Sequence, residues 1–395
     1  MQLKRLFFSI IVLLLGFSLK GAPLVQLSEN AKISVLTFSP GQEVSTVYGH
    51  TAIRINDVTK NLDIVFNYGV FGFYETNFIL RFARGQTDYM LDFDRYFQAT
   101  YDRYKRNNQG IYEQVLNLTE KEKNQIWEFL NENLKVENRE YRYNFFYDNC
   151  ATRVRDAVIS HINGEVVFPT KSREMSFMKH ASVYQRVLPW LDFGTWLALG
   201  SPANKKATSW EEMFLPEYLK KHFDNAEITT EDGQRRKLVE SSGVILAPAT
   251  KPLFTLISPL VASIILMLFV VNSTIRQQRY HKLRYFWDNL LLLITGTVGV
   301  VACLLMLFSE HPALQENWNI LWALPTNLIF FFIWKNKYWR NVSKWYWPLL
   351  AITMSLFLVL NFMIPQSFYP AVFLIVIMVL IRAASNSWLL IFKKN

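Results

Sequence analysis

The run Tyr147-Asp148-Asn149-Cys150-Ala151-Thr152-Arg153 decides how the amino-terminal half of this chain folds. Asp148 and Asn149 are residue types that cap helices, because their side chains accept hydrogen bonds from the first backbone N–H groups. Apolar residues follow at helical spacing. The run therefore predicts a helix over residues 151–160 with Cys150 at its first turn.

A second run, Tyr48-Gly49-His50-Thr51-Ala52-Ile53-Arg54, lies about 100 residues upstream and leads into an alternating, β-branched segment. Three such segments are predicted strands: Ile33–Phe38, Thr51–Asn56 and Leu62–Asn67. A helix is predicted to begin at Thr119, which forms a capping box with Glu122. Together these elements predict an α+β domain over residues 23–246.

A lone thiol and a distant histidine are the minimal parts of a thiol-nucleophile enzyme, because the thiolate attacks and a base must generate it. A helix start is expected to lower the pKa of Cys150, and its N–H groups could receive an oxyanion. His50 is the candidate base. Asn67 on the neighbouring strand is the candidate that orients its ring, with Asp63 as a second. The alternative is an inert buried cysteine and a structural histidine.

Four further residues are candidates for substrate binding: Arg54, Asp148, Asn149 and His311. An arginine could bind a phosphate head group, and a histidine in an outer loop could meet head groups or a substrate amine. Each candidate also has a structural alternative. Arg54 could pair with a carboxylate, Asp148 and Asn149 could be capping groups, and His311 could be an interfacial helix-end residue.

The remaining histidines of this domain compete poorly for a chemical role. His161 lies about 16 Å from Cys150 along the same predicted helix, too far for proton transfer. His180 and His222 stand in polar sequence with no Cys or His at ligand spacing, so no metal site is predicted. The chain has no Gly-rich phosphate loop, and no cofactor is expected.

The composition indicates a membrane protein. Of the 395 residues, 51% are hydrophobic and 15% aromatic, which is too apolar for an ordinary soluble protein. The net charge of +10 is concentrated beside apolar segments, since residues 251–395 contain 12 Lys and Arg against 3 Asp and Glu. Membrane orientation explains this excess better than a nucleic-acid surface does, so no nucleic-acid partner is expected.

Residues 1–22 have the basic start and short apolar run of an export signal, and the sequence leaves open whether it is cleaved. After a linker at residues 247–252, residues 253–395 are predicted to form an all-α membrane domain. About five spans are expected: Leu253–Val271, Leu290–Phe308, Ile320–Trp334, Pro348–Met363 and Ala371–Leu390. Lys and Arg in alternate loops place those loops in the cytoplasm and the α+β domain in the periplasm, at the bacterial inner membrane.

Several motifs in a fixed order carry a family resemblance: Tyr48–Arg54, Phe66–Phe71, Tyr89–Leu91, Asn138–Phe145, Tyr147–Thr152, Met213–Glu217 and Asn319–Pro325. The order of a histidine strand, a second polar strand and Asn-Cys at a helix start resembles the circularly permuted papain-like thiol hydrolases and acyltransferases, which include lecithin:retinol acyltransferase and permuted NlpC-type proteins. Over residues 35–335 the chain looks more closely like the Lnb-type lipoprotein N-acyltransferases. The permuted acyltransferases often have a second histidine where this chain has Asn67.

The resemblance implies that Cys150 and His50 are the catalytic pair. It also implies transfer of an acyl chain from a membrane phospholipid, through a Cys150 thioester, to the amino-terminal amine of a diacylated lipoprotein. The residues alone leave two other functions open. One is a periplasmic cysteine hydrolase, an amidase or peptidase that acts on cell-wall peptide, and the other is a non-enzymatic membrane scaffold.

Overall fold

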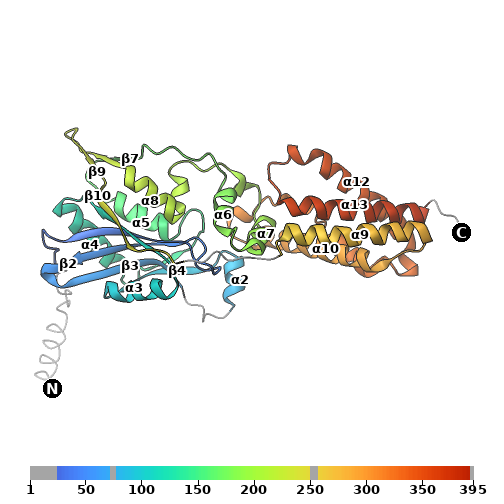
Figure 1. Ribbon diagram of the computed structural model, residues 1–395, viewed down its shortest axis with the longest axis horizontal. Coiled ribbons are helices and arrows are strands. Elements are labelled where there is room, and N and C mark those ends of the chain that lie inside the picture. Colours follow the sequence, from blue (N-terminus) through green and yellow to red (C-terminus); the bar gives the residue numbers. More distant parts are fainter. Residues whose placement is uncertain (1–24, 72–76, 250–256, 392–395) are drawn as a thin grey trace, which may run out of the picture.

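The computed structural model describes residues 25–71, 77–249 and 257–391. The predicted export signal lies outside these residues, as does part of the predicted linker. The described chain forms two parts placed end to end, a sheet-rich part and a bundle of long helices (Figure 1). This arrangement confirms the predicted α+β domain followed by an all-α membrane domain.

The sheet of the first part has seven antiparallel strands in the order β10-β5-β1-β2-β3-β4-β6. The strands are β1 (Lys32–Phe38), β2 (His50–Asp57), β3 (Leu62–Val70), β4 (Asp88–Asp94), β5 (Ile111–Leu116), β6 (Glu140–Arg142) and β10 (Val239–Leu246). The predicted hairpin of β2 and β3 is confirmed, with Ile53 opposite Phe66. The sequence reasoning missed the outer strands, which are short or polar.

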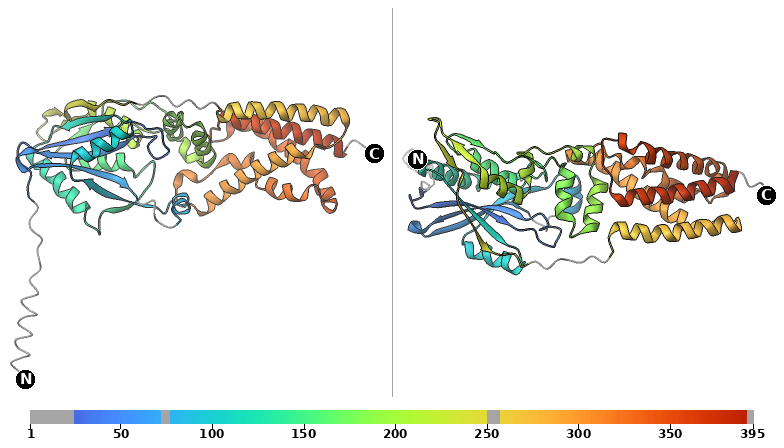
Figure 2. Two further views of the ribbon diagram at one scale, coloured as in Figure 1. Left: turned by 60° about the horizontal axis from the view of Figure 1, so that its bottom comes forward. Right: turned by 45° about the horizontal axis from the view of Figure 1, so that its top comes forward.

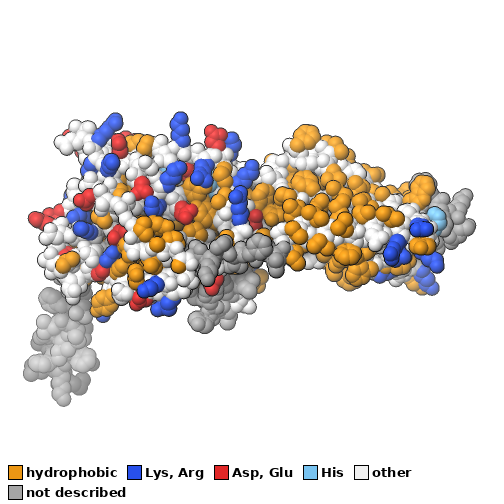
Figure 3. Space-filling view, in the orientation of Figure 1, with side chains coloured by type: hydrophobic (Ala, Val, Ile, Leu, Met, Phe, Trp, Pro, Cys, Tyr) orange, Lys and Arg blue, Asp and Glu red, His pale blue; other side chains and the backbone are white. Residues whose placement is uncertain are grey.

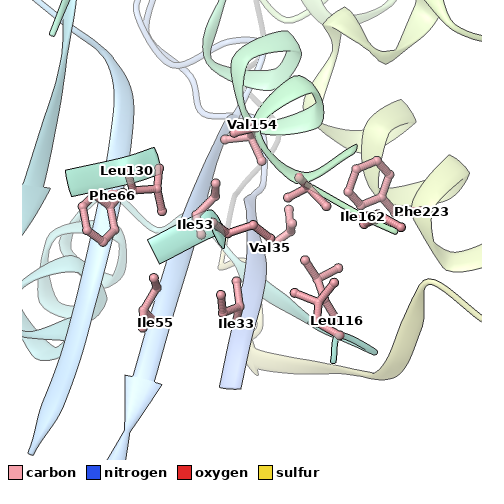
Figure 4. Packing of buried hydrophobic residues seen from close by; sticks show 14 of the residues in the cluster. Ile33, Val35, Ile53, Ile55, Phe66, Leu116, Leu130, Val154, Ile162 and Phe223 are labelled. Carbon is pink, nitrogen blue, oxygen red and sulfur yellow. The ribbon is translucent and has the colours of Figure 1, made fainter. Parts of the chain in front are cut away.

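Each face of the sheet is covered by helices because the strands alternate apolar residues between the two faces. Ile33, Val35, Ile53 and Ile55 point toward α4 (Glu120–Asn133), α5 (Cys150–Ile159) and α8 (Pro216–Asn225), where they form the main core (Figure 4). Their strand neighbours form a smaller core under α3 (Phe97–Arg106). The predicted capping box of Thr119 and Glu122 at the start of α4 is confirmed.

Smaller elements complete the sheet-rich part. They are η1 (Val58–Lys60), α2 (Phe78–Ala83), α6 (Phe177–Gln185), α7 (Pro189–Ala198), η2 (Ser201–Asn204), η3 (Glu211–Phe214) and a small sheet of β7 (Glu165–Val167), β8 (Glu227–Thr229) and β9 (Arg235–Lys237). Helices α6 and α7 lie directly between the sheet and the bundle (Figure 2). They therefore connect the two parts.

The membrane part contains four described helices that are long and apolar enough to cross a bilayer. They are α9 (Pro259–Tyr280), α10 (Tyr285–Phe308), α12 (Arg340–Leu360) and α13 (Pro370–Ile391). The predicted third span, over residues 320–334, instead consists of part of the turn η5 (Trp318–Leu321) followed by α11 (Thr326–Ile333), a helix of eight residues. The number of membrane crossings stays a prediction.

The helix α11 and the turn before it pack closely on α10, because two glycines of α10 face them. A Cβ atom at Gly296 would lie 2.2 Å from the backbone nitrogen of Leu328, and one at Gly299 would lie 1.9 Å from the carbonyl oxygen of Ala323. Small residues at such contacts are the usual means of close helix packing in membranes. This contact holds the segment against α10.

A buried ion pair joins three membrane helices at the end away from the sheet. Arg382 on α13 donates through Nε and Nη2 to Asp288 on α10, at 2.7 and 2.8 Å. It also donates to Gln277 and Thr274 on α9, at 2.7 and 3.2 Å. Both charged side chains are about 99% buried. The sequence analysis did not identify this cluster.

The surface separates into the same two parts. Hydrophobic side chains cover the bundle, whereas charged side chains are scattered over the sheet-rich part (Figure 3). Lys and Arg also gather at the far end of the bundle, as the predicted cytoplasmic loops require. The apolar band therefore lies between this basic end and the sheet-rich part.

Side-chain amides of the membrane part bind the last carbonyl groups of α7. Asn317 donates to Leu197 and Ala198 at 2.8 and 3.0 Å, and Asn319 donates to Trp196 at 3.0 Å. Carbonyl groups at a helix end lack partners within the helix, so these amides satisfy them. The motif that starts at Asn319 thus fixes the domain to the bundle.

Candidate active site

Cys150 is the first residue of α5, where the sequence placed it. Asn149 caps this helix by accepting from the N–H groups of Ala151 and Thr152 at 2.8 and 3.0 Å. Its amide donates to the carbonyls of Phe145 and Phe214, both at 2.8 Å. These four bonds engage the Asn149 side chain, which is 96% buried, and hold the loop before Cys150 in place.

Backbone N–H groups surround the half-buried Cys150 thiol. Burial raises the pKa of Cys150 to about 11, against hydrogen bonds from the N–H groups of Thr51, Ala151 and Cys150 itself, which lower it. The expected lowering by the helix start therefore exists, but desolvation outweighs it. The prediction of a net lowered pKa was wrong.

The start of α5 lies against β2, and the thiol faces the backbone of Thr51, the residue after His50. Gly49 allows this strand start, because its φ is +76° and a Cβ there would lie 2.4 Å from the carbonyl oxygen of Phe38. Gly69 on β3 lies on the other side, and a Cβ there would lie 3.5 Å from that of Cys150. Gly69 thus lets α5 approach the sheet, and Gly49 lets β2 begin close to β1.

The imidazole of His50 is held by Asn67 on β3. His50 Nε2 lies 3.3 Å from Asn67 Oδ1, and the amide nitrogen of Asn67 donates to Asp94 at 3.4 Å. An amide oxygen can only accept, so this bond puts the ring proton on Nε2 and leaves Nδ1 as the basic nitrogen. Burial lowers the pKa of His50 to about 4, although the bond to Asn67 raises it.

Tyrosines line the thiol on the side of β6. Burial raises the pKa of Tyr141, and the nearby Cys150 raises it further. Its hydroxyl group is buried and has no hydrogen-bond partner within the described part of the chain. A Cβ atom at Gly69 would lie 3.8 Å from this hydroxyl oxygen, so the Tyr141 hydroxyl and the Cys150 side chain both lie close to Gly69. The sequence reasoning missed Tyr141, although it belongs to the Asn138–Phe145 motif.

The other sequence candidates lie in different settings. Arg54 donates to Asp63 at 2.7 and 2.9 Å and to Glu113 at 3.2 Å, which also removes Asp63 from the surroundings of His50. Asp148 accepts from Arg153 at 2.5 and 2.7 Å. Arg54 thus makes the ion pair of its structural alternative, whereas Asp148 pairs with Arg153 and does not cap the helix, a role that Asn149 fills.

His311 lies at the junction of the two parts, in the loop after α10. Its Nε2 is 3.2 Å from the carbonyl oxygen of Phe82, and burial lowers its pKa. Beside it, Glu310 accepts from Arg142 and Gln86 at 3.0 and 2.7 Å. These contacts join the loop to the periplasmic domain, and no contact with Cys150 is seen among the described residues.

His180 and His222 lie in a buried cluster with Glu212, not in the polar surroundings expected from the sequence. Both are fully buried, and their Nε2 atoms lie 3.6 and 2.7 Å from Glu212. The cluster ties α6, η3 and α8 together. No group of three or more His, Cys, Asp or Glu in the described ranges has the geometry of a metal site.

Two family models match the chain, the Lnb N-terminal periplasmic domain at residues 26–177 and the Lnb transmembrane domain at residues 251–395. The chain belongs to the Lnb family. This confirms the resemblance and identifies an inner-membrane protein with a periplasmic amino-terminal domain from the lipoprotein N-acyltransferase family. No curated protein and no solved structure matches the chain.

Proposed function

We propose that this Lnb protein transfers an acyl chain from a membrane phospholipid to the amino-terminal amine of a diacylated lipoprotein, through a thioester on Cys150. The observation that carries the proposal is the close approach of Cys150 to β3 at Gly69, two residues after Asn67, which holds the His50 ring. The bond between His50 and Asn67 supports it further, because it leaves Nδ1 available as a base.

In the first half-reaction, His50 Nδ1 takes the thiol proton while the sulfur of Cys150 attacks the carbonyl carbon of a phospholipid ester. The C–O bond to the glycerol then breaks, the oxygen takes the proton from His50, and a lysophospholipid leaves. The acyl chain stays on Cys150 as a thioester. In the second half-reaction the lipoprotein amine attacks this thioester, its proton passes to His50, and then to the departing sulfur.

Two groups are suited to stabilise the oxyanion of each tetrahedral intermediate. Asn149 already binds the N–H groups of Ala151 and Thr152, so the N–H of Cys150, which faces its own sulfur in the resting protein, is the donor of the first turn that can bind the oxyanion. The Tyr141 hydroxyl is the second, because its raised pKa keeps it protonated and it has no partner among the described residues. Such donors stabilise developing charge most strongly where water is excluded.

The shifted pKa values predict an uncharged resting pair. With the pKa of the thiol at about 11 and that of His50 at about 4, both groups are neutral at pH 7. The thiolate then forms only as the ester carbonyl is attacked. Such a buried, neutral pair favours a lipid substrate that displaces water over a soluble peptide, and this ranks acyl transfer above the cell-wall hydrolase.

The test uses purified full-length protein in phospholipid nanodiscs with a diacylated lipopeptide, beside its Cys150→Ala variant. Mass spectrometry should detect one added acyl chain on the peptide and a hydroxylamine-labile acyl group on Cys150, both absent from the variant. A folded protein that acylates neither would refute the proposal. Cleavage of cell-wall peptides by the same preparation would favour the hydrolase instead.

A further inference from the structure

A cavity of about 490 Å³ lies where the periplasmic domain meets the loop between α12 and α13. Its domain wall comes from the start of α6, including Glu174, Ser176 and Lys179, and from Asn204 and Lys206. Its membrane wall comes from Asn361–Phe362, Ile364–Phe368 and Phe373. The cavity is therefore polar and charged on one side and mainly apolar on the other.

The two walls are fixed to each other by hydrogen bonds. Asn204 accepts from the Ser367 N–H at 3.0 Å, and the buried Gln366 donates to Leu199 at 3.2 Å and accepts from Trp318 at 2.8 Å. A β-bridge between Ser176 and Lys206 fixes the domain wall of the cavity. Hydrogen bonds thus hold both walls of the cavity in place at the junction of the two parts.

The apolar wall continues onto the lipid-facing side of α12. Phe362, which lines the cavity, and its neighbour Met363 are 78% and 70% exposed, although both are large and apolar. Further along α12, exposed apolar side chains recur at helical spacing as one stripe: Leu349, Ile352, Leu356 and Val359. Side chains of this kind face the hydrocarbon of a bilayer. The cavity therefore opens toward the outer leaflet.

The polar wall carries a net positive charge. Two lysines, Lys179 and Lys206, face one carboxylate, Glu174, which lies 3.3 Å from Lys206. Cationic side chains at the level of the lipid head groups bind phosphate. The diacylated end of a lipoprotein has a cationic amine and no phosphate, so this wall is better suited to a phospholipid than to the acceptor.

The cavity is also close in structure to the thiol loop. Phe177 follows Ser176 in the chain and packs on Phe146 and Tyr147, with ring centroids 5.0 and 5.5 Å apart. Tyr147 lies three residues before Cys150. One layer of aromatic side chains thus separates the cavity wall from the loop that positions the nucleophile.

We infer that this cavity holds one phospholipid of the outer leaflet, with its phosphate at Lys179 and Lys206 and an acyl chain along Phe362 and α12. The inference deepens the proposed function, on which it rests for the role of that lipid as acyl donor. Binding itself does not require the reaction.

The experiment uses full-length Cys150→Ala protein, which cannot react, in nanodiscs that contain phosphatidylglycerol with a diazirine in its acyl chain. Mass spectrometry should map the adducts to Phe362, Phe368 or Phe373. Lys179→Glu combined with Lys206→Glu should lower this labelling about tenfold, since each lysine near a lipid phosphate contributes to binding. The matched control, Lys121→Glu with Lys221→Glu, reverses two exposed lysines outside the cavity lining and should leave the labelling unchanged.

A second variant, Ser367→Trp, fills the cavity without removing a charge and should also lower the labelling, with its folding checked by thermal unfolding. Adducts confined to other helices, or equal labelling in the Lys→Glu variant and its control, would overturn the inference. Equal competition by soluble glycerophosphoglycerol would also overturn it, because the apolar wall would then contribute nothing.

Acyl transfer is measured separately with Cys150 present. Labelled cavity residues without transfer would leave the lipid site standing and refute the acyltransferase, whereas transfer without labelling would refute the lipid site alone.

Discussion

Two buried polar clusters, one in each part of the molecule, differ in how fully their groups are paired. In the membrane part, Arg382 donates to Asp288, Gln277 and Thr274 and to the carbonyl of Arg284. At the thiol, the hydroxyl of Tyr141 has no hydrogen-bond partner among the described residues. Burial raises the pKa of Cys150 and lowers that of His50, so both groups are neutral in the resting protein.

This difference separates structural from chemical polar groups. A buried charge whose donors are all engaged, like Arg382, gains little from a ligand, so its role is to join helices. An unsaturated cluster has donors and proton acceptors to offer to a reacting molecule. The two clusters should therefore respond in opposite ways to mutation, the first by loss of stability and the second by loss of activity.

The largest effect is expected at the base of the thiol cluster. His50→Ala should lower the initial rate of lipopeptide acylation roughly a thousandfold, because general base catalysis is lost. Asn67→Ala keeps the imidazole and should lower the rate about tenfold through misorientation. Thermal unfolding should show both variants folded. A His50→Ala protein that keeps a tenth of the rate would contradict the assigned role.

Mutation of the membrane cluster should lower the free energy of unfolding. Arg382→Met leaves the Asp288 carboxylate buried and unpaired, at an expected cost of about 3–5 kcal/mol in the free energy of unfolding. The double variant with Asp288→Leu should recover most of this loss, because no lone charge remains. Denaturant unfolding in detergent micelles measures both. A single variant as stable as wild type would show that the pair is not needed to join the helices.

The unpaired hydroxyl of Tyr141 allows a more specific test of the difference between the two clusters. Tyr141→Phe should slow acyl transfer about a hundredfold with little change in stability, since it removes an oxyanion donor that makes no bond in the resting protein. Tyr68 is the matched control, because its ring packs on Tyr141 while its hydroxyl donates to Asn133 at 2.8 Å. Tyr68→Phe should lower stability by about 1 kcal/mol and leave the rate nearly unchanged. Equal rate losses in the two variants would count against the oxyanion role.

The last test follows the reactivity of the Cys150 thiol with pH. Because the pKa of the thiol is raised to about 11, the thiolate fraction should grow about tenfold for each pH unit from 7 toward 10. Alkylation of Cys150 by iodoacetamide, followed by peptide mass spectrometry, measures this slope. A rate that levels off near pH 7 would instead indicate a thiolate–imidazolium pair.

Periodic and capping patterns were enough to predict much of the fold. The β2–β3 hairpin and the helices α4 and α5 follow from local signals, a period of two and N-cap residues, which act over a few neighbouring positions. The short strands at the sheet edges and the eight-residue α11 lack such signals. Their places depend on pairing and on the close contact with Gly296 and Gly299.

The sequence by itself determined the family, the α+β and membrane parts, and the residue types near the thiol, since motifs and hydropathy are properties of the chain. Only the tertiary structure decided that Asn67 rather than Asp63 bonds to His50, that the Arg54 side chain is bound by carboxylates, and that Tyr141 lies by the thiol. It also decided the direction of the pKa shift at Cys150. The helix-start effect can be read from local sequence, whereas desolvation depends on every segment that packs around the sulfur.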